Sequence, residues 1–217
     1  VPLFSDLGMA SLKKISEKMV TRNYPKGKMV VIEESLGRTF FLIKSGAVKV
    51  TRMSEDGREV ILAMLGEGDF FGEMALLDGE GRSANVVTIE EAILLSLQRG
   101  DFLYILESYP KIAIKLLEEL TSRIRYSDQQ IESLSLSDAE QRICITIIRL
   151  AEDLGQIKGG TVHIDNLPYH QDIANMAGTS RETVSRVLKT LEDKKYLKRH
   201  GRKTVIQNFN KFCQLFS

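Results

Sequence analysis

The segment Gly178-Thr-Ser-Arg-Glu-Thr-Val-Ser-Arg-Val-Leu-Lys-Thr-Leu191 decides how the C-terminal part of this chain folds. Its apolar residues recur three and four positions apart, at Val184, Val187, Leu188 and Leu191. This spacing predicts one apolar stripe along a helix. Thr179 and Ser180 stand just before it and are residue types that cap helix N-termini, with Glu182 placed as the second member of a capping pair.

A second, shorter helix is expected just upstream, over Gln171–Ala177. Gly178 lies between the two helices, where a tight turn needs a residue that tolerates positive φ. Two short helices joined by a glycine turn, the second with an Arg-rich outer face, are typical of a helix-turn-helix. The alternative from the pattern alone is an ordinary helical hairpin with a solvated charged face.

Basic side chains crowd the segment that follows, at Lys194, Lys195, Lys198, Arg199, Arg202 and Lys203. Tyr196–His200 and Thr204–Ile206 are expected to be strands that flank the turn Gly201–Lys203. A helix-turn-helix followed by a basic hairpin is typical of a winged helix. The wing would contact phosphates while the helix enters the major groove.

Charge is unevenly distributed along the 217 residues, a length that suits one large domain or two small ones. From Pro168 to Ser217 the chain carries ten Lys or Arg and four Asp or Glu residues, a surplus of six positive charges. The net charge of the whole chain is +1, so the remainder carries −5. A basic tail on an acidic body indicates a polyanion-binding module attached to a part that binds something else.

The two cysteines, Cys144 and Cys213, form no disulfide framework, so a reducing, cytoplasmic location is expected. No apolar run is long enough to span a membrane, and no signal peptide is visible. The histidines are dispersed, and neither a nucleophile–base pair nor a metal-ligand spacing occurs. We therefore expect neither an enzyme nor a metal site.

The first half of the chain has the spacing of a β structure. After a helix expected over Ser5–Val20, glycines recur roughly every ten residues. Short apolar runs lie between them, at Met29–Ile32, Phe40–Ile43, Ala47–Val50, Val60–Leu65, Ala84–Ile89 and Ala92–Leu97. Ser54–Gly57 has the composition of a hairpin turn. These features predict an all-β sandwich or roll.

The least strand-like part of this half is Phe70–Ala84. Met74–Leu77 is expected to form one helical turn after Gly72, and its free N–H groups would make an anion site. Arg82 and Ser83 would add a donor fork and a hydroxyl suited to a phosphate, while Glu73 is an acceptor suited to a sugar hydroxyl. The alternative is a surface loop with scattered charges.

A long helix is expected from Tyr109-Pro110 to about Leu136, with a short one over Arg99–Glu107 before it. Heptad spacing marks the seam Leu117, Leu120, Ile124, Ser127, Ile131 and Leu134. Such a seam is typical of a coiled-coil dimer interface; the alternative is a helix packed on its own domain. Ser137-Asp138 would cap the next helix. The predicted parts are therefore residues 1–108, 109–136 and 137–217.

These parts, in this order, resemble the cyclic AMP receptor protein/FNR family of bacterial transcription regulators over essentially the whole chain. Phe71–Leu77 together with Arg82-Ser-Ala84 resembles the family's phosphate-binding cassette, and Ser180–Leu188 resembles its recognition helix. The resemblance implies an α+β chain: a jelly-roll-like N-terminal β-roll that binds a cyclic nucleotide, a long dimerisation helix and a C-terminal winged helix-turn-helix domain.

The resemblance also implies ligand contacts, at Gly72, Glu73, Met74, Ala75, Arg82, Ser83, Ala84, Ser127 and Asp128. Glu73 would accept from a ribose hydroxyl and Arg82 would pair with the cyclic phosphate. Ser127 and Asp128 fall where the best-known cyclic AMP receptors contact adenine with Thr and Ser. Cyclic AMP is the effector that the resemblance favours. Because Asp128 departs from that pattern, cyclic GMP or another nucleotide stays open.

Contacts to a palindromic DNA duplex are implied for Gln171, Thr179, Ser180, Arg181, Glu182, Thr183, Ser185, Arg186, Lys189 and Arg202. Arg suits guanine and Glu suits cytosine. The resemblance implies a TGTGA-like half-site, with TTGA-like second. RNA polymerase is the further partner that the resemblance implies. A second hypothesis is a DNA-binding regulator that needs no ligand and is controlled by its own concentration. A third is a nucleotide-binding signalling protein whose winged helix contacts another protein instead of DNA.

Other sensory chemistry of the family is disfavoured by composition. Iron–sulfur members need a cysteine cluster, and residues 1–143 contain no Cys. Haem members usually use a His in the sensory domain, whereas His163, His170 and His200 all lie beyond it. Each of these histidines is expected to be structural or a phosphate contact.

Overall fold

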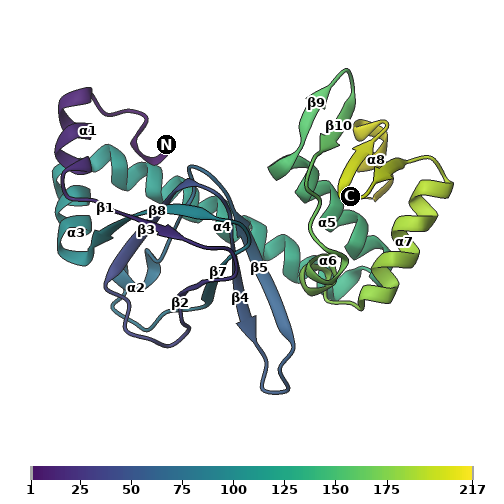
Figure 1. The fold of residues 1–217 in the computed structure, drawn as a ribbon, viewed down its shortest axis with the longest axis horizontal. Helices are drawn as coiled ribbons and strands as arrows, with labels where there is room; N and C mark the ends of the chain where they lie inside the picture. The colour runs from purple at the N-terminus through teal and green to yellow at the C-terminus, as the bar shows by residue number, and fades with distance from the viewer. Residues whose placement is uncertain (1, 217) are drawn as a thin grey trace. The chain divides into compact units, whose positions relative to one another are not determined.

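The computed structural model describes residues 2–216 and divides into two compact units, one ending at Tyr126 and the other beginning at Ser127 (Figure 1). The first unit holds strands and the start of a long helix, and the second holds the remaining helices and a small sheet. None of the helices described is both long and apolar enough to cross a membrane.

Two four-stranded antiparallel sheets make up the first unit, with strand orders β1-β8-β3-β6 and β2-β7-β4-β5. The strands are β1 (Val20–Tyr24), β2 (Met29–Val31), β3 (Thr39–Ser45), β4 (Val48–Met53), β5 (Glu59–Leu65), β6 (Phe70–Phe71), β7 (Asn85–Thr88) and β8 (Ala92–Gln98). The predicted β-roll is therefore confirmed. The short strand β6 was not expected; it exists because Phe41 pairs with Phe71.

Strand β3 is buried on both faces because it serves two apolar clusters. Phe40 belongs to the cluster that contains Phe102 of helix α3 (Arg99–Ser108), and the two rings stack with centroids 4.7 Å apart. Its neighbour Phe41 points the other way, as alternate strand residues do, into a cluster with Val86. Since β6 pairs with the buried middle of this strand, at Phe41 and Leu42, the pairing fixes the backbone that leads into Gly72.

Four helices and a 3₁₀ turn complete the first unit: η1 (Pro2–Phe4), α1 (Met9–Ser16), α2 (Met74–Leu77), α3 (Arg99–Ser108) and the first part of α4 (Pro110–Leu136). The predictions for α2, α3 and α4 are confirmed. The single helix expected over Ser5–Val20 is wrong at both ends. Gly8 is extended, with φ −69° and ψ 155°, the helix ends at Ser16, and Val20 pairs with Ser96 of β8.

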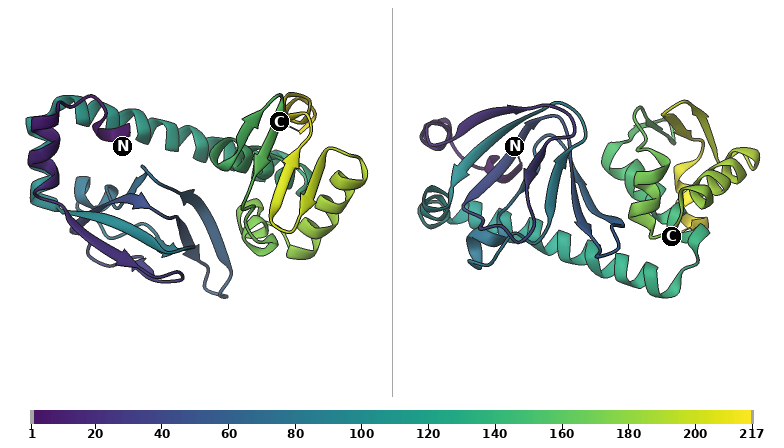
Figure 2. Two further views of the ribbon diagram at one scale, coloured as in Figure 1. Left: turned by 45° about the horizontal axis from the view of Figure 1, so that its top comes forward. Right: turned by 60° about the horizontal axis from the view of Figure 1, so that its bottom comes forward.

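The second unit contains α5 (Ala139–Leu154), α6 (His170–Ala177), α7 (Arg181–Asp193), α8 (Phe209–Phe216) and a sheet of order β11-β12-β10-β9. Its strands are β9 (Gln156–Lys158), β10 (Thr161–Ile164), β11 (Leu197–His200) and β12 (Lys203–Ile206) (Figure 2). The helix pair α6–α7 and the hairpin β11–β12 match the predicted winged helix. Strand β9 and helix α8 were not predicted.

Gly178 joins α6 to α7 in the left-handed conformation, with φ 59° and ψ 48°, as the turn required. Ser180 is the N-cap of α7, and its hydroxyl accepts a hydrogen bond from the Thr183 N–H at 3.2 Å. The predicted capping pair with Glu182 is wrong, because Thr183 and not Glu182 stands three residues after the cap. Asp138 caps α5 as predicted, accepting from the Gln141 N–H.

Arg142 ties the start of α5 to this turn. Its guanidinium donates to the carbonyls of Ala177 and Gly178, at 2.8 and 3.1 Å, and to the carbonyl of Ser137 at 2.9 Å. Those carbonyls end helices α6 and α4, where backbone acceptors lack intrahelical partners. The position of α7 is thereby linked to the segment between α4 and α5.

Candidate functional site

Strand β6 ends at Gly72, where the chain turns sharply into the single turn of α2. Gly72 has φ +83°, and a Cβ there would lie 2.5 Å from Nη1 of Arg82 and 3.0 Å from the carbonyl oxygen of Thr39. Only glycine fits both the backbone conformation and this close approach. Because Met74 and Ala75 are the first residues of α2, their N–H groups lack intrahelical acceptors.

The side chain of Arg82 is built into this turn and is only 7% exposed. Its Nη1 donates to the carbonyl of Gly72 at 2.7 Å and its Nη2 donates to the carbonyl of Thr39 at 2.6 Å. The pKa of this guanidinium is lowered, because the effect of burial outweighs the opposing charge of Glu73. Gly37 leaves the space needed, since a Cβ there would lie 2.6 Å from Nε of Arg82.

Glu73 is also buried, and its carboxylate faces Arg123 of α4. Nη1 of Arg123 lies 3.1 Å from Oε1 of Glu73, while Nη2 donates to the carbonyl of Phe70 at 2.8 Å. The Arg123 guanidinium also stands 4.5 Å above the Phe70 ring and pairs with Glu119 at 3.3 Å. The pKa of the Glu73 carboxyl is raised, because the effect of burial outweighs the opposing charge of Arg123.

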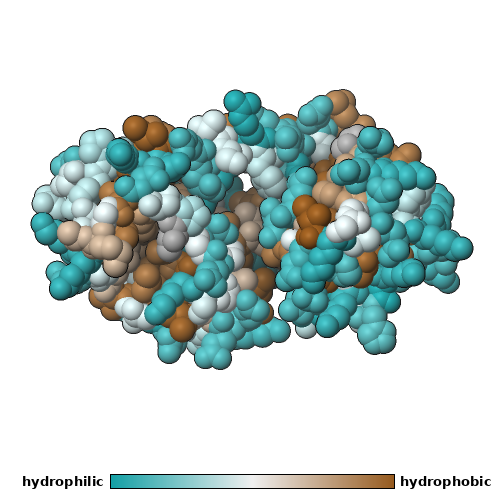
Figure 3. Space-filling view, turned by 90° about the horizontal axis from the view of Figure 1, so that it is seen from above, coloured by the Kyte–Doolittle hydropathy of each residue, from teal (hydrophilic) through white to brown (hydrophobic). Residues whose placement is uncertain are grey.

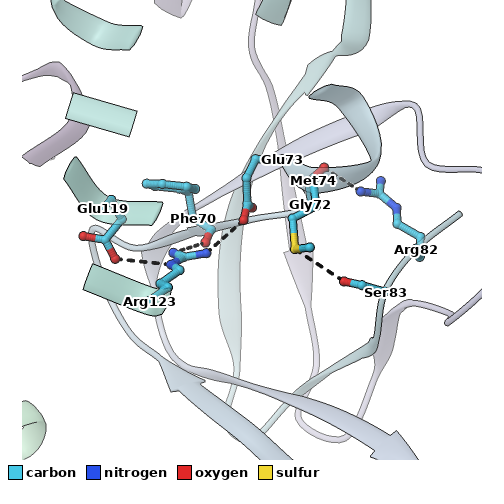
Figure 4. A network of polar contacts seen from close by, with 8 residues as sticks. All are labelled: Phe70, Gly72, Glu73, Met74, Arg82, Ser83, Glu119 and Arg123. Atoms are coloured by element: carbon cyan, nitrogen blue, oxygen red, sulfur yellow. Dashed lines mark hydrogen bonds and ion pairs between the residues drawn. The ribbon is translucent and has the colours of Figure 1, made fainter. Parts of the chain in front are cut away.

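Figure 4 shows Arg123 and Arg82 reaching the 72–74 turn from opposite sides. The carboxylate of Glu73 and the buried guanidinium of Arg82 thus both lie at one turn, where the first N–H groups of α2 add backbone donors. This arrangement suits a ligand that carries both a phosphate and a hydroxyl. Sequence analysis missed Arg123, because it lies outside the heptad seam and no spacing relates position 123 to position 73.

The remaining predicted ligand residues take different positions. The hydroxyl of Ser83 is exposed and donates to the sulfur of Met74 at 3.7 Å. The side chains of Ala75 and Ala84 are buried, so only their backbone groups could contact a ligand. Ser127 and Asp128 are exposed on α4 in the second unit. The ligand roles of all the named residues stay predictions.

The outer face of α7 carries the predicted DNA contacts. The side chains of Arg181, Glu182, Arg186 and Lys189 are exposed, whereas Thr183 and Ser185 are half-buried. Gln171 is exposed on α6, Thr179 is half-buried in the turn, and Ser180 is exposed while it caps α7. The surface of the second unit seen in Figure 3 is mostly hydrophilic.

Two basic side chains of the wing are engaged within the second unit. Arg202 donates from Nε to the carbonyl of Leu167 at 2.9 Å, and its guanidinium lies 4.7 Å above the Tyr169 ring. Arg199 is half-buried and pairs with Glu192 at 2.6 Å. The charge of Arg199 is therefore balanced within the unit, whereas Arg202 is held in place but stays exposed and keeps its charge.

The heptad seam of α4 is mainly solvent-exposed in the single chain. The exposed fractions are 62% for Leu117, 61% for Ile124, 63% for Ile131 and 57% for Leu134. Leu120 is the exception, since it packs partly against the core of the first unit. An exposed row of large apolar side chains on one helix is typical of a protein–protein interface.

Comparisons with known proteins agree with this geometry. The family model "Cyclic nucleotide-binding domain" matches residues 21–109, and the model "Crp-like helix-turn-helix domain" matches residues 141–215. A curated relative from Thermus thermophilus, named cyclic AMP receptor protein, is 38% identical over 192 residues, which is 88% of this chain and 86% of the relative.

Solved structures show the same fold. The catabolite activator protein of Thermus thermophilus is 32% identical, with a TM-score of 0.58, over 99% of this chain and 98% of that chain. FixK2 from Bradyrhizobium japonicum has a higher TM-score of 0.81, at 23% identity, over 92% of this chain and 98% of its own. The second likeness concerns the fold alone.

Proposed function

This chain belongs to the cyclic AMP receptor protein/FNR family of DNA-binding transcription regulators, which are not enzymes, and on that premise we propose that it acts as a homodimer gated by cyclic AMP. In this proposal the N-terminal unit binds the nucleotide and the paired α7 helices read a palindromic TGTGA-like site in double-stranded DNA. RNA polymerase is the proposed further partner and the cytoplasm the proposed location.

The observation that carries the ligand proposal is the turn at Gly72, where Arg82 and Glu73 are both buried. The phosphate of a cyclic nucleotide would lie at Arg82 and at the first N–H groups of α2, because both are donors suited to an anion. The carboxylate of Glu73 would accept from the ribose hydroxyl. The name of the Thermus relative supports cyclic AMP as the base-specific choice.

Asp128 favours a second candidate. It is a carboxylate on the exposed surface of α4, at a position where the family's cyclic AMP receptors carry a neutral hydroxyl. A carboxylate adds a negative charge and accepts hydrogen bonds without donating them, so it can accept from the exocyclic amine of guanine as well as from that of adenine. A nucleotide other than cyclic AMP is therefore the alternative effector, and regulation without any effector is the further one.

Arg123 supports a route from the ligand to the dimer helix. It belongs to α4 and contacts Glu73, so a ligand that engages Glu73 also changes a contact of α4. In the proposed dimer, α4 pairs with its copy along the exposed seam. The ligand would favour the dimer in which the two α7 helices lie about 34 Å apart, one helical turn of DNA.

Calorimetric titration of the intact protein with cyclic AMP, and separately with cyclic GMP, tests the ligand proposal. Arg82→Lys keeps a positive charge but loses the donor fork, so we expect at least about a tenfold loss of cyclic AMP affinity. Arg38→Lys is the control, because Arg38 is exposed on the loop before β3. Equal affinity of wild type and Arg82→Lys would contradict the phosphate role of Arg82.

A further inference from the structure

Helices α6 and α7 and the wing strand β11 are linked by a chain of side-chain hydrogen bonds centred on His170. Nδ1 of His170 lies 2.7 Å from the hydroxyl oxygen of Ser185 on α7. Nε2 lies 3.1 Å from Nη1 of Arg199 on β11. Arg199 in turn donates from Nη2 to Oε2 of Glu192, again on α7, at 2.6 Å. These four residues lie within the second unit and take no part in the nucleotide site.

The chemistry of these groups fixes the positions of the protons. An Arg guanidinium has only donors, so Nε2 of His170 must accept from Arg199. A neutral imidazole with an unprotonated Nε2 carries its proton on Nδ1. The Nδ1–H group then donates to the hydroxyl oxygen of Ser185. Burial, the charge of Arg199 and the charge of Arg181 all lower the pKa of His170, which agrees with a neutral ring.

The hydroxyl of Ser185 is left with its own hydrogen to place. Within residues 2–216, Ser185 makes no side-chain hydrogen bond other than the one with His170. It stands on α7 beside Arg186 and three residues after Glu182, both of which are exposed. Its hydrogen is therefore available to an acceptor outside the protein, on the face of α7 that we propose reads DNA.

We propose that His170 is a positioning residue that fixes the Ser185 hydroxyl as a hydrogen-bond donor toward DNA. In the major groove such a donor suits the acceptors guanine O6 or N7, adenine N7 and thymine O4, and not the amine of cytosine. The inference rests on the proposed role of α7 as the reading helix. It adds a base preference at the position of Ser185 that the charged residues of α7 do not specify.

Arg199 of the wing holds the His170 imidazole through its hydrogen bond to Nε2. Its charge is balanced by Glu192, and its Nε is buried without a partner among the described residues, so its two terminal nitrogens alone hold it in place. Glu192 and Ser185 both belong to α7, and Arg199 comes from the wing. The wing strand therefore orients the imidazole, and the imidazole orients the hydroxyl.

The first test uses DNA selected by the protein itself. The wild-type protein, with cyclic AMP present, selects duplexes from a random-sequence pool, and affinities are then measured by fluorescence anisotropy at fixed salt. We expect His170→Ala and Ser185→Ala each to weaken binding to the selected duplex about fivefold, the scale of one neutral hydrogen bond. Binding to a scrambled duplex should change by less than about twofold, because phosphate contacts dominate it.

The double variant separates positioning from independent contact. If His170 acts through Ser185, the variant that carries both alanines should bind no more weakly than Ser185→Ala alone. His170→Asn offers an amide donor in place of Nδ1–H and should retain most of the wild-type affinity. His163→Ala is the matched control, since His163 is a half-buried histidine of the same unit that contacts Thr161. Multiplicative losses, or an unaffected His170→Ala, would overturn the proposal.

A second measurement needs neither a variant nor DNA. Long-range ¹H–¹⁵N NMR spectra of the free protein report which imidazole nitrogen carries the proton, and we expect Nδ1 of His170 to be protonated at pH 7. A proton on Nε2 would overturn the proposal whatever DNA is selected. If the wild type selects no DNA sequence, α7 does not read DNA and the proposed function is wrong. The NMR spectra report the His170 tautomer independently of DNA, so this outcome is distinguishable from a wrong tautomer.

Discussion

At the residue scale, position 178 requires glycine for two reasons, its backbone conformation and the close approach of Leu134, and only the first could be predicted from the sequence. Its positive φ was predictable from its place between two helices. The close approach of Leu134, whose Cδ2 would lie 3.0 Å from a Cβ at Gly178, was not. A side chain at this position would therefore strain the backbone and also press on α4 near its end.

We expect Gly178→Ala to destabilise the protein by more than about 1–2 kcal/mol, the usual cost of a left-handed conformation in a residue with a Cβ. Gly159→Ala is the control, because Gly159 has φ +58° and no atom within 4 Å of the added Cβ. Urea unfolding followed by circular dichroism gives both values. Equal losses in the two variants would show that Leu134 does not restrict position 178.

His170 gives a prediction about pH. Its pKa in the folded protein lies below the ordinary value of 6.5, so the unfolded chain binds more protons between these two values. The free energy of unfolding should therefore fall as the pH is lowered through this window. His170→Asn should show a shallower decline in urea unfolding measured from pH 7.5 to 5. Parallel curves for the two proteins would contradict the assigned environment of His170.

At the scale of elements, regular patterns were predictable and pairing-dependent ones were not. The heptad spacing of α4 and the Pro at its start located that helix at Pro110–Leu136. Strands β6 and β9 are two and three residues long, and each exists only because a neighbouring strand supplies its hydrogen-bond partners. The start of β1 at Val20 was missed for the same reason: pairing with β8 overrides the helical pattern before it.

The candidate site shows the same division. Glu73 and Arg82 lie in one segment, and their residue types and spacing were enough to nominate them. Arg123 lies 50 residues after Glu73, and only the fold brings its guanidinium to the carboxylate. The contact of Arg199 with His170 is likewise a product of the fold, since sequence counting treated Arg199 as one more basic residue of the wing.

The exposed seam of α4 leads to a prediction about assembly. Replacing Ile124 by Glu would place a charge in the middle of the proposed dimer interface, where it would be desolvated without a partner. We expect Ile124→Glu to sediment as a monomer in analytical ultracentrifugation at micromolar concentration. Ser122→Glu lies off the seam on the same helix and should leave the dimer intact. A dimeric Ile124→Glu would place the interface elsewhere.

At the scale of the whole molecule, helix α4 links the proposed nucleotide site to the proposed DNA-reading helix. Arg123 of α4 contacts Glu73 of the proposed nucleotide site, and Arg142 donates both to Ser137, just after α4, and to Gly178 in the turn before α7. In the proposed mechanism the ligand changes the contacts of α4 and so couples the two sites, and such coupling is reciprocal and typically about 1–3 kcal/mol. The nucleotide should therefore change the affinity for DNA, and DNA should change the affinity for the nucleotide.

The most direct test is the affinity of the intact protein for a fluorescent palindromic duplex with two TGTGA half-sites, measured by anisotropy at fixed salt with and without saturating cyclic AMP. We expect cyclic AMP to tighten binding by roughly 5–150-fold. A scrambled duplex should show no such gain. Equal affinity for the palindrome in both conditions, in a protein that calorimetry shows to bind cyclic AMP, would contradict nucleotide control of DNA binding.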